Sequence, residues 1–112
     1  MNFTLTPIND DSGIIEIGEA LDFKNAIDFK GLADEKVEAG IKNFVLDFED
    51  TNVLDSTGLG TIFWLYRRIS QAGGKIVFAC VSAPVRVVVQ LTRTYKVFRQ
   101  FATLEEAVRC FA

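Results

Sequence analysis

Hydroxyl, carboxyl and glycine residues stand together in one short stretch of the chain, Asp55-Ser56-Thr57-Gly58-Leu59-Gly60. The stretch follows an apolar segment and an acidic loop, and it opens an amphipathic pattern that predicts a helix. A serine at a helix start commonly caps backbone N–H groups that lack a partner, and capping is the structural interpretation of Ser56. Glycine inside a first helical turn costs about 1 kcal/mol relative to alanine. The two glycines therefore indicate that another group approaches this backbone closely.

The predicted helix runs from Ser56 to about Ala72, where Gly73-Gly74 stops it. One stripe of its helical wheel is apolar and should face the core: Leu59, Ile62, Phe63, Tyr66 and Ile69. Other residues fall away from that stripe: Gly60, Trp64, Arg67 and Gln71. A large aromatic on a surface helix, beside exposed hydroxyls, is typical of a docking face. We therefore expect Gly60 and Trp64 to contact a partner.

The stretch matches no catalytic or phosphate-binding motif. Phe63 stands where a dinucleotide fingerprint needs its third glycine, and the pattern G-x-x-x-x-G-K-[ST] does not occur. The sequence has no histidine, which excludes Ser-His-Asp and Cys-His arrangements and the common zinc sites. A serine nucleophile would depend on Asp55 or Asp22, and carboxylates are ordinarily too weak to activate an alcohol at neutral pH. We therefore expect a protein that is not an enzyme.

Several carboxylates precede the stretch, namely Asp47, Glu49, Asp50 and Asp55. Such a cluster could bind a divalent cation, but its spacing departs from the calcium-binding pattern D-x-[DN]-x-[DN]-G-x₅-E. A solvated acidic loop is the preferred interpretation. We expect neither a metal ion nor a cofactor.

Length and composition place the chain among ordinary globular domains. Its 112 residues suit one domain, residues 1–112, and 49% hydrophobic with 24% charged residues argue against a disordered or fibrous chain. The net charge of -3 comes from 12 basic and 15 acidic residues, which suggests charges spread along the chain with no basic stripe for a phosphate backbone. Nucleic acid is therefore not an expected partner.

The two cysteines and the N-terminal residues indicate where in the cell the protein is expected. Cys80 and Cys110 lie in apolar stretches, and a domain of this size needs no disulfide, so a reducing cytoplasm fits best. The first residues lack a basic region followed by an apolar one, and no apolar run approaches the roughly 18 residues that would span a bilayer. We expect a cytoplasmic protein without membrane insertion.

The hydrophobic pattern predicts alternating strands and helices. A hairpin is expected from apolar segments 3–5 and 14–17, followed by a helix over 25–39, a strand over 44–48, the helix over 56–72 and a strand over 75–80. Residues 85–91 fit a helix or a strand, and we choose a helix because Pro84 suits a first helical turn. A short strand near 97–98 and a helix from Thr103, with Glu106 at capping-box spacing, complete the chain. This order predicts an α/β fold with a mixed, mainly parallel sheet of four to five strands and about four helices.

These residues, in this order of elements, resemble the STAS domain of bacterial anti-sigma-factor antagonists over essentially the whole chain. The stretch DSTGLG carries the resemblance, and the supporting pieces are the segment 18–22, Gly73-Gly74 and the closing segment 103–107. The resemblance implies a partner-switching protein that binds a switch kinase, itself an anti-sigma factor, and so releases a sigma factor. Phosphorylation by that kinase would end the binding, and a phosphatase of the PP2C type would restore it.

Carried over residue by residue, the resemblance implies that Ser56 is the phosphoacceptor and Asp55 its acidic neighbour. Asp22 would be the loop aspartate near the site, and Thr57 would be a second, less favoured phosphoacceptor. Together with Gly58, Gly60 and Trp64, these residues form the expected partner-binding surface of a monomer or weak dimer. The sequence departs from the family pattern at Ala20, which is an extra residue, at Trp64, and in residues 92–95, which replace a glycine-containing turn.

Two other functions stay open at this stage. In the first, the chain is a STAS module of a transport, lipid-trafficking or sensor complex, and Ser56 only caps the helix. In the second, it is a small nucleotide-binding or nucleotide-hydrolysing protein, which the lack of a phosphate-binding lysine or glycine-rich cradle disfavours.

Overall fold

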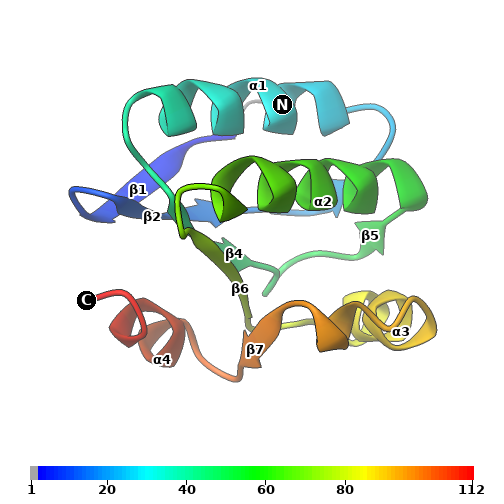
Figure 1. The fold of residues 1–112 in the computed structure, drawn as a ribbon. Coiled ribbons are helices and arrows are strands. Elements are labelled where there is room, and N and C mark those ends of the chain that lie inside the picture. The colour runs from blue at the N-terminus through cyan, green and yellow to red at the C-terminus, as the bar shows by residue number, and fades with distance from the viewer. Residues whose placement is uncertain (1–2) are drawn as a thin grey trace.

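The computed structural model describes residues 3–112 as an α/β domain built on a five-stranded sheet (Figure 1). The sheet order is β1-β2-β4-β6-β7, from β1 (Leu5–Asn9), β2 (Ser12–Glu16), β4 (Asn43–Asp47), β6 (Lys75–Ala79) and β7 (Arg99–Phe101). The helices are α1 (Ala26–Glu38), α2 (Ser56–Ser70), α3 (Ala83–Leu91) and α4 (Leu104–Arg109), with a 3₁₀ turn η1 (Thr94–Lys96). β1 pairs antiparallel with β2, and the other neighbours pair in parallel. The predicted fold class is confirmed.

Helices cover both faces of this sheet (Figure 1). α1 and α2 lie side by side over one face, where the larger core contains Phe29 of α1, Phe44 of β4 and Ile62 of α2. α4 packs on the other face through Ala107, against Val45 and other residues of the central strands. The parallel central strands are buried on both faces, which explains why their sequences are almost continuously apolar.

The predicted elements occur with shifted bounds. The hairpin forms, although its turn is at Asp10-Asp11, so β1 extends further than expected. The ambiguous segment is a helix: Ser82 caps α3 by accepting a hydrogen bond from the Val85 N–H, and Pro84 lies in its first turn. Thr103 caps α4 by accepting a hydrogen bond from the Glu106 N–H, so the predicted N-cap is confirmed. The Glu106 carboxylate accepts from the Thr103 hydroxyl and not from its backbone N–H, so within residues 3–112 only this half of a capping box forms.

The last strand was predicted two residues too early. Residues 97–98 are not a strand, because Arg93 adopts a left-handed conformation with φ 56° and the chain turns through η1. This turn drives Phe98 into the core, where its ring stacks on Phe78 at 4.9 Å and meets the edge of Tyr66 at 5.4 Å. β7 then begins at Arg99. The apolar side chain of Phe98 packs in the core, and Phe98 itself is not part of a strand.

A second, two-stranded sheet was not predicted. β3 (Ala20–Leu21) pairs in parallel with β5 (Val53–Leu54), and it lies in segments that were expected to be loops. This small sheet holds the loop before α1 beside the start of α2. It therefore positions the stretch that the sequence singled out.

Within residues 3–112, no helix combines the length and the apolar character needed to cross a membrane. Cys80 and Cys110 are both free thiols.

Candidate functional site

The site is built around the first turn of α2, and Asp55 is its central structural residue. Asp55 is the N-cap of the helix: its Oδ1 accepts a hydrogen bond of 2.8 Å from the Gly58 N–H. Its Oδ2 accepts one of 2.9 Å from the Phe23 N–H, in the loop that precedes α1. One carboxylate therefore caps α2 and ties a distant loop to it, and both of its oxygens are occupied within the chain.

Ser56 does not cap the helix. The capping interpretation of Ser56 is wrong because the preceding aspartate already supplies the acceptor for the first turn. Ser56 and Thr57 are exposed, and neither hydroxyl forms a hydrogen bond with any residue in the range 3–112. Two free hydroxyls thus face solvent at a helix start, where the first N–H groups also lack intrahelical partners.

The two glycines of the stretch have different surroundings. A Cβ on Gly58 would lie 2.2 Å from the backbone oxygen of Leu21, so the close approach that the sequence indicated is made by the chain's own β3. Gly58 is accordingly buried. At Gly60 nothing lies within 4 Å of the Cβ position, and the residue is exposed. Of this pair, only Gly60 has its backbone exposed on the surface.

Asp22 lies in the loop that Asp55 holds. Its Oδ1 accepts from the Lys24 N–H at 2.9 Å, and its backbone oxygen accepts from the Ala26 N–H at 2.9 Å, which begins α1. Asn25 closes the loop: its Oδ1 accepts from the Asp22 N–H and its Nδ2 donates to the Ala20 backbone oxygen. The structure therefore ties the loop that contains Asp22 to Asp55, the residue before Ser56.

Exposed apolar side chains lie around this loop, and their exposure was not predicted from the sequence. Phe23 is 69% exposed, Ile27 77% and Val53 44%. Phe23 is held by Asp55, Ile27 follows one helical turn later on α1, and Val53 belongs to β5, which leads into α2. A signal was available, because Phe23 and Ile27 are four residues apart and lie outside the buried positions of α1.

Trp64 is not the freely exposed side chain that the helical wheel predicted, whereas its contact with a partner stays a prediction. It is only partly exposed and packs against the main core. The Lys30 ammonium of α1 lies 4.9 Å from the Trp64 ring centroid, and the Arg68 guanidinium lies 6.0 Å from it. The helical wheel placed Trp64 away from the sheet, but that side of α2 is where α1 packs.

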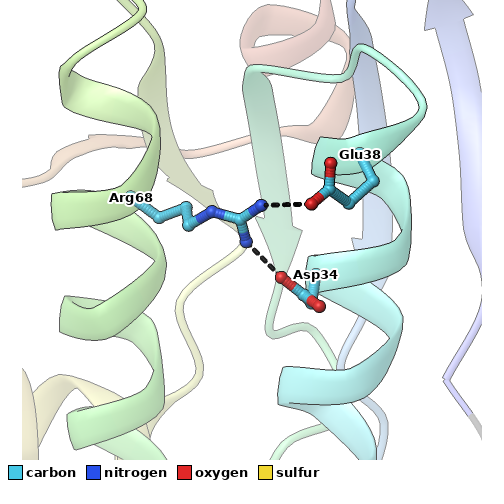
Figure 2. A network of polar contacts seen from close by, with 3 residues as sticks. All are labelled: Asp34, Glu38 and Arg68. Carbon is cyan, nitrogen blue, oxygen red and sulfur yellow. Dashed lines mark hydrogen bonds and ion pairs between the residues drawn. The ribbon is translucent and has the colours of Figure 1, made fainter.

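Ion pairs also join α1 and α2 (Figure 2). Arg68 of α2 reaches across to α1 and forms ion pairs with Asp34 and Glu38, the latter at 3.2 Å. The face of α2 near Trp64 and Arg68 is therefore an interface between helices, which leaves the beginning of α2 as the open part.

The acidic loop is less solvated than predicted. Asp47 is buried, and its Oδ1 accepts from the Glu49 N–H at 3.0 Å, whereas Asp55 serves as the cap described above. Ligand atoms of Asp47, Glu49 and Cys80 lie within 4.8 Å of one another. Burial raises the pKa of the Cys80 thiol, and the carboxylates of Asp47 and Glu49 raise this pKa further. A protonated thiol is a poor metal ligand, because metals bind the thiolate.

Comparison with known proteins agrees with this geometry. The model of the STAS domain family matches residues 4–107. The anti-sigma factor antagonist SpoIIAA, in its unphosphorylated form, has a TM-score of 0.86 at 21% identity, covering 97% of this chain and 95% of that one. SpoIIAA of Bacillus in its phosphorylated form has a TM-score of 0.79 at 20% identity, covering 98% and 99%.

Two further structures show the range of proteins that share the fold. A candidate anti-sigma factor antagonist of Thermotoga maritima has a TM-score of 0.86 at 27% identity, covering 96% of this chain and 92% of that one. A sulfate transporter family protein of Wolinella succinogenes has a TM-score of 0.77 at 21% identity, covering 95% and 87%. Because the family model matches residues 4–107, nearly the whole chain, the protein belongs to the STAS domain family.

Proposed function

We propose that the protein is an anti-sigma-factor antagonist that binds a switch kinase and thereby releases a sigma factor. Phosphorylation of Ser56 by that kinase inactivates it, and a PP2C-type phosphatase reactivates it. The observation that carries this proposal is the free hydroxyl of Ser56, which is exposed at the start of α2 while Asp55 performs the capping. Because this hydroxyl is exposed and forms no hydrogen bond within residues 3–112, a kinase can reach it.

The surroundings of Ser56 suit a switch that acts on binding and not on folding. A phosphoserine carries about -1.5 to -2 charges at neutral pH, and the N-terminal end of a helix stabilises negative charge. The hydrogen bonds that Asp55 accepts from the Gly58 and Phe23 N–H groups do not involve the side chain of Ser56. The phosphate therefore adds charge to a surface whose backbone is already fixed.

We propose as the docking surface the Ser56 face, defined by the exposed residues Phe23, Ile27, Val53, Ser56 and Gly60. Its apolar side chains supply area that a partner can bury, with the hydroxyl among them. A dianion buried there meets a desolvation cost of several kcal/mol, plus repulsion from any acidic group of the partner. A loss of about 3 kcal/mol corresponds to a weakening of roughly a hundredfold in Kd.

Phosphopeptide mapping tests the assignment of the phosphoacceptor. After reaction with ATP and the cognate kinase, mass spectrometry should locate one phosphate on Ser56. The Ser56→Ala variant should incorporate none, and Thr57→Ala is the matched control that should incorporate as much as the wild type. Phosphate on Thr57 in the Ser56→Ala variant would contradict the assignment.

The likeness to a sulfate transporter family protein supports a second candidate, a STAS module of a transport complex. A role in a lipid-trafficking or sensor complex would use the same surface in the same way. In all of these, Ser56 would contact a partner without being modified. The mapping experiment separates the two candidates, because no phosphate would appear in the wild type if the second is right.

A further inference from the structure

Charge is distributed unevenly along the chain, contrary to the even spread suggested by the net charge. Every acidic residue except Glu105 and Glu106 lies at or before Asp55. The segment 56–104 contains basic residues and no acidic one: Arg67, Arg68, Lys75, Arg86, Arg93, Lys96 and Arg99. This segment forms α2, β6, α3, η1 and β7. The second half of the fold therefore contributes basic surface.

Exposed apolar side chains lie among the last of these basic residues. On α3, Val85 and Val89 face the core, while Val87 is 58% exposed and Leu91 is 80% exposed. Val87 and Leu91 are four residues apart and so share one face of the helix. Tyr95, 42% exposed, follows in η1, which packs against α3.

The outer side of α3 is hollowed between these residues. A shallow depression of about 380 Å³ is lined by Ala83, Arg86, Val87, Gln90 and Leu91. We define the α3 surface as Val87, Leu91 and Tyr95 with the flanking cations Arg86, Arg93 and Lys96. Within residues 3–112 none of these three cations forms an ion pair, and Arg86 donates only to the Val81 backbone oxygen, at 3.2 Å.

We propose that the α3 surface is a second docking site, which binds an amphipathic helix of a partner protein whose apolar stripe is flanked by acidic residues. The apolar side chains of that helix would pack along Val87 and Leu91 and enter the depression, as in other helix-in-groove complexes. Its carboxylates would face the unpaired cations on either side. This binding is independent of Ser56 and of the proposed phosphorylation.

Charge decides between this occupant and a second copy of the chain. A symmetric dimer through the α3 surface would bring each copy's Arg93 and Lys96 close to the same cations of the other, which costs affinity. Since Leu91 is 80% exposed and can protrude into a bilayer, a lipid surface is the other occupant that the experiment below tests. A nucleic acid backbone could bind the cations but would make no favourable contact with the apolar side chains of Val87 and Leu91.

A titration with designed peptides tests the proposal on the full chain. The probe is a peptide of about 18 residues, roughly five helical turns, with leucines on one face and glutamates flanking them. The matched control peptide keeps the leucines and replaces the glutamates with lysines. Nuclear magnetic resonance of the ¹⁵N-labelled protein should show shifts of the amides of residues 83–97 with the acidic peptide and no comparable shifts with the basic one.

Variants place the binding on the α3 surface. Leu91→Asp should raise the Kd of the acidic peptide by about tenfold or more. Ala39→Asp is the control and should leave the Kd unchanged, since Ala39 is an exposed apolar residue at the C-cap of α1 and belongs to neither docking surface. Lys96→Glu should raise the Kd, whereas Lys24→Glu, in the loop before α1, should leave it unchanged. Thermal melts show whether each variant stays folded.

Four results would overturn the proposal. The first is equal binding of the acidic and basic peptides, and the second is shifts that centre on Phe23 and Ser56. The third is concentration-dependent dimerisation that Leu91→Asp abolishes, which would assign the surface to a second copy. The fourth is binding to phosphatidylglycerol vesicles that Leu91→Asp abolishes while the acidic peptide has no effect, which would assign it to a membrane.

Discussion

Gly58 and Gly60 lie two residues apart in α2, yet the space around them predicts opposite effects of the same substitution. A methyl group at Gly58 would meet the Leu21 carbonyl at 2.2 Å, and a backbone atom cannot move aside as a side chain can. Gly58→Ala should therefore lower the free energy of unfolding by about 1 to 3 kcal/mol, as overpacking does. Gly60→Ala meets open space and should raise it by up to about 1 kcal/mol.

Urea unfolding of the wild type and the two glycine variants measures this difference. The two substitutions add the same methyl group to the same helix, so they control for helix propensity. Equal stabilities of Gly58→Ala and Gly60→Ala would show that α2 does not approach β3 as closely as described.

The two cysteines should differ in reactivity because their environments differ. Burial and the neighbouring carboxylates of Asp47 and Glu49 raise the pKa of Cys80, so at a given pH it has less thiolate than an ordinary thiol. Cys110 is exposed. With iodoacetamide at about pH 8, below the usual pKa of near 8.5, Cys110 should react faster, and the rate at Cys80 should keep rising at higher pH.

Single-cysteine variants, Cys110→Ser and Cys80→Ser, allow each rate to be followed by mass spectrometry. A Cys80 rate that equals or exceeds that of Cys110 at this pH would contradict the assigned environment.

Among the elements of the fold, Asp55 connects the loop before α1 to the start of α2. Asp55→Ala removes acceptors for both the Gly58 and the Phe23 N–H groups. Loss of an N-cap costs about 0.5 to 2 kcal/mol, and the freed loop should exchange its amide hydrogens faster. Hydrogen exchange of the Phe23 amide should rise in Asp55→Ala and stay unchanged in Ser56→Ala, because Ser56 bonds neither group. Equal exchange in the two variants would argue against the tie.

Trp64 belongs to the contact between α1 and α2, so its removal should affect stability. The ring packs against the core and lies under Lys30. Trp64→Ala should lower the free energy of unfolding by about 2 kcal/mol, less than for a fully buried tryptophan. Gln71→Ala, at the exposed C-cap directly after the same helix, is the control. A melting temperature unchanged by Trp64→Ala would restore Trp64 to the docking surface.

The types of the elements could be predicted from the sequence because each leaves a periodic pattern of several residues. The two-residue strands β3 and β5 could not, since a pair as short as Ala20-Leu21 has no period. β7 begins later than predicted because Arg93 has a left-handed backbone conformation. Glycine adopts this conformation readily, whereas an arginine in the sequence gives no indication of it.

The candidate site was predictable in part for the same kind of reason. The position of Ser56 at a helix start follows from local sequence, and the structure agrees. The role of Asp55 could not be predicted, because its second hydrogen bond reaches Phe23, 32 residues earlier in the chain. The environment of Trp64 also depended on which neighbour covers α2, and a helical wheel describes one helix without its neighbours.

For the molecule as a whole, we expect charge on Ser56 to change partner binding and to leave the fold intact. The fold should tolerate it because the helix start favours negative charge and Asp55 remains the cap. Binding should not tolerate it, because the proposed docking surface includes Ser56, and the neighbouring Asp55 holds the loop that carries the exposed Phe23.

Titration calorimetry of the cognate kinase with unmodified and Ser56-phosphorylated protein tests this claim most directly, with thermal melts of both forms alongside. We predict that phosphorylation weakens binding by about a hundredfold or more, equivalent to roughly 3 kcal/mol, and leaves the melting temperature nearly the same. Ser56→Asp, with one negative charge, should show a smaller loss of affinity in the same direction. Equal affinity of the kinase for the two forms, at equal melting temperature, would contradict the claim.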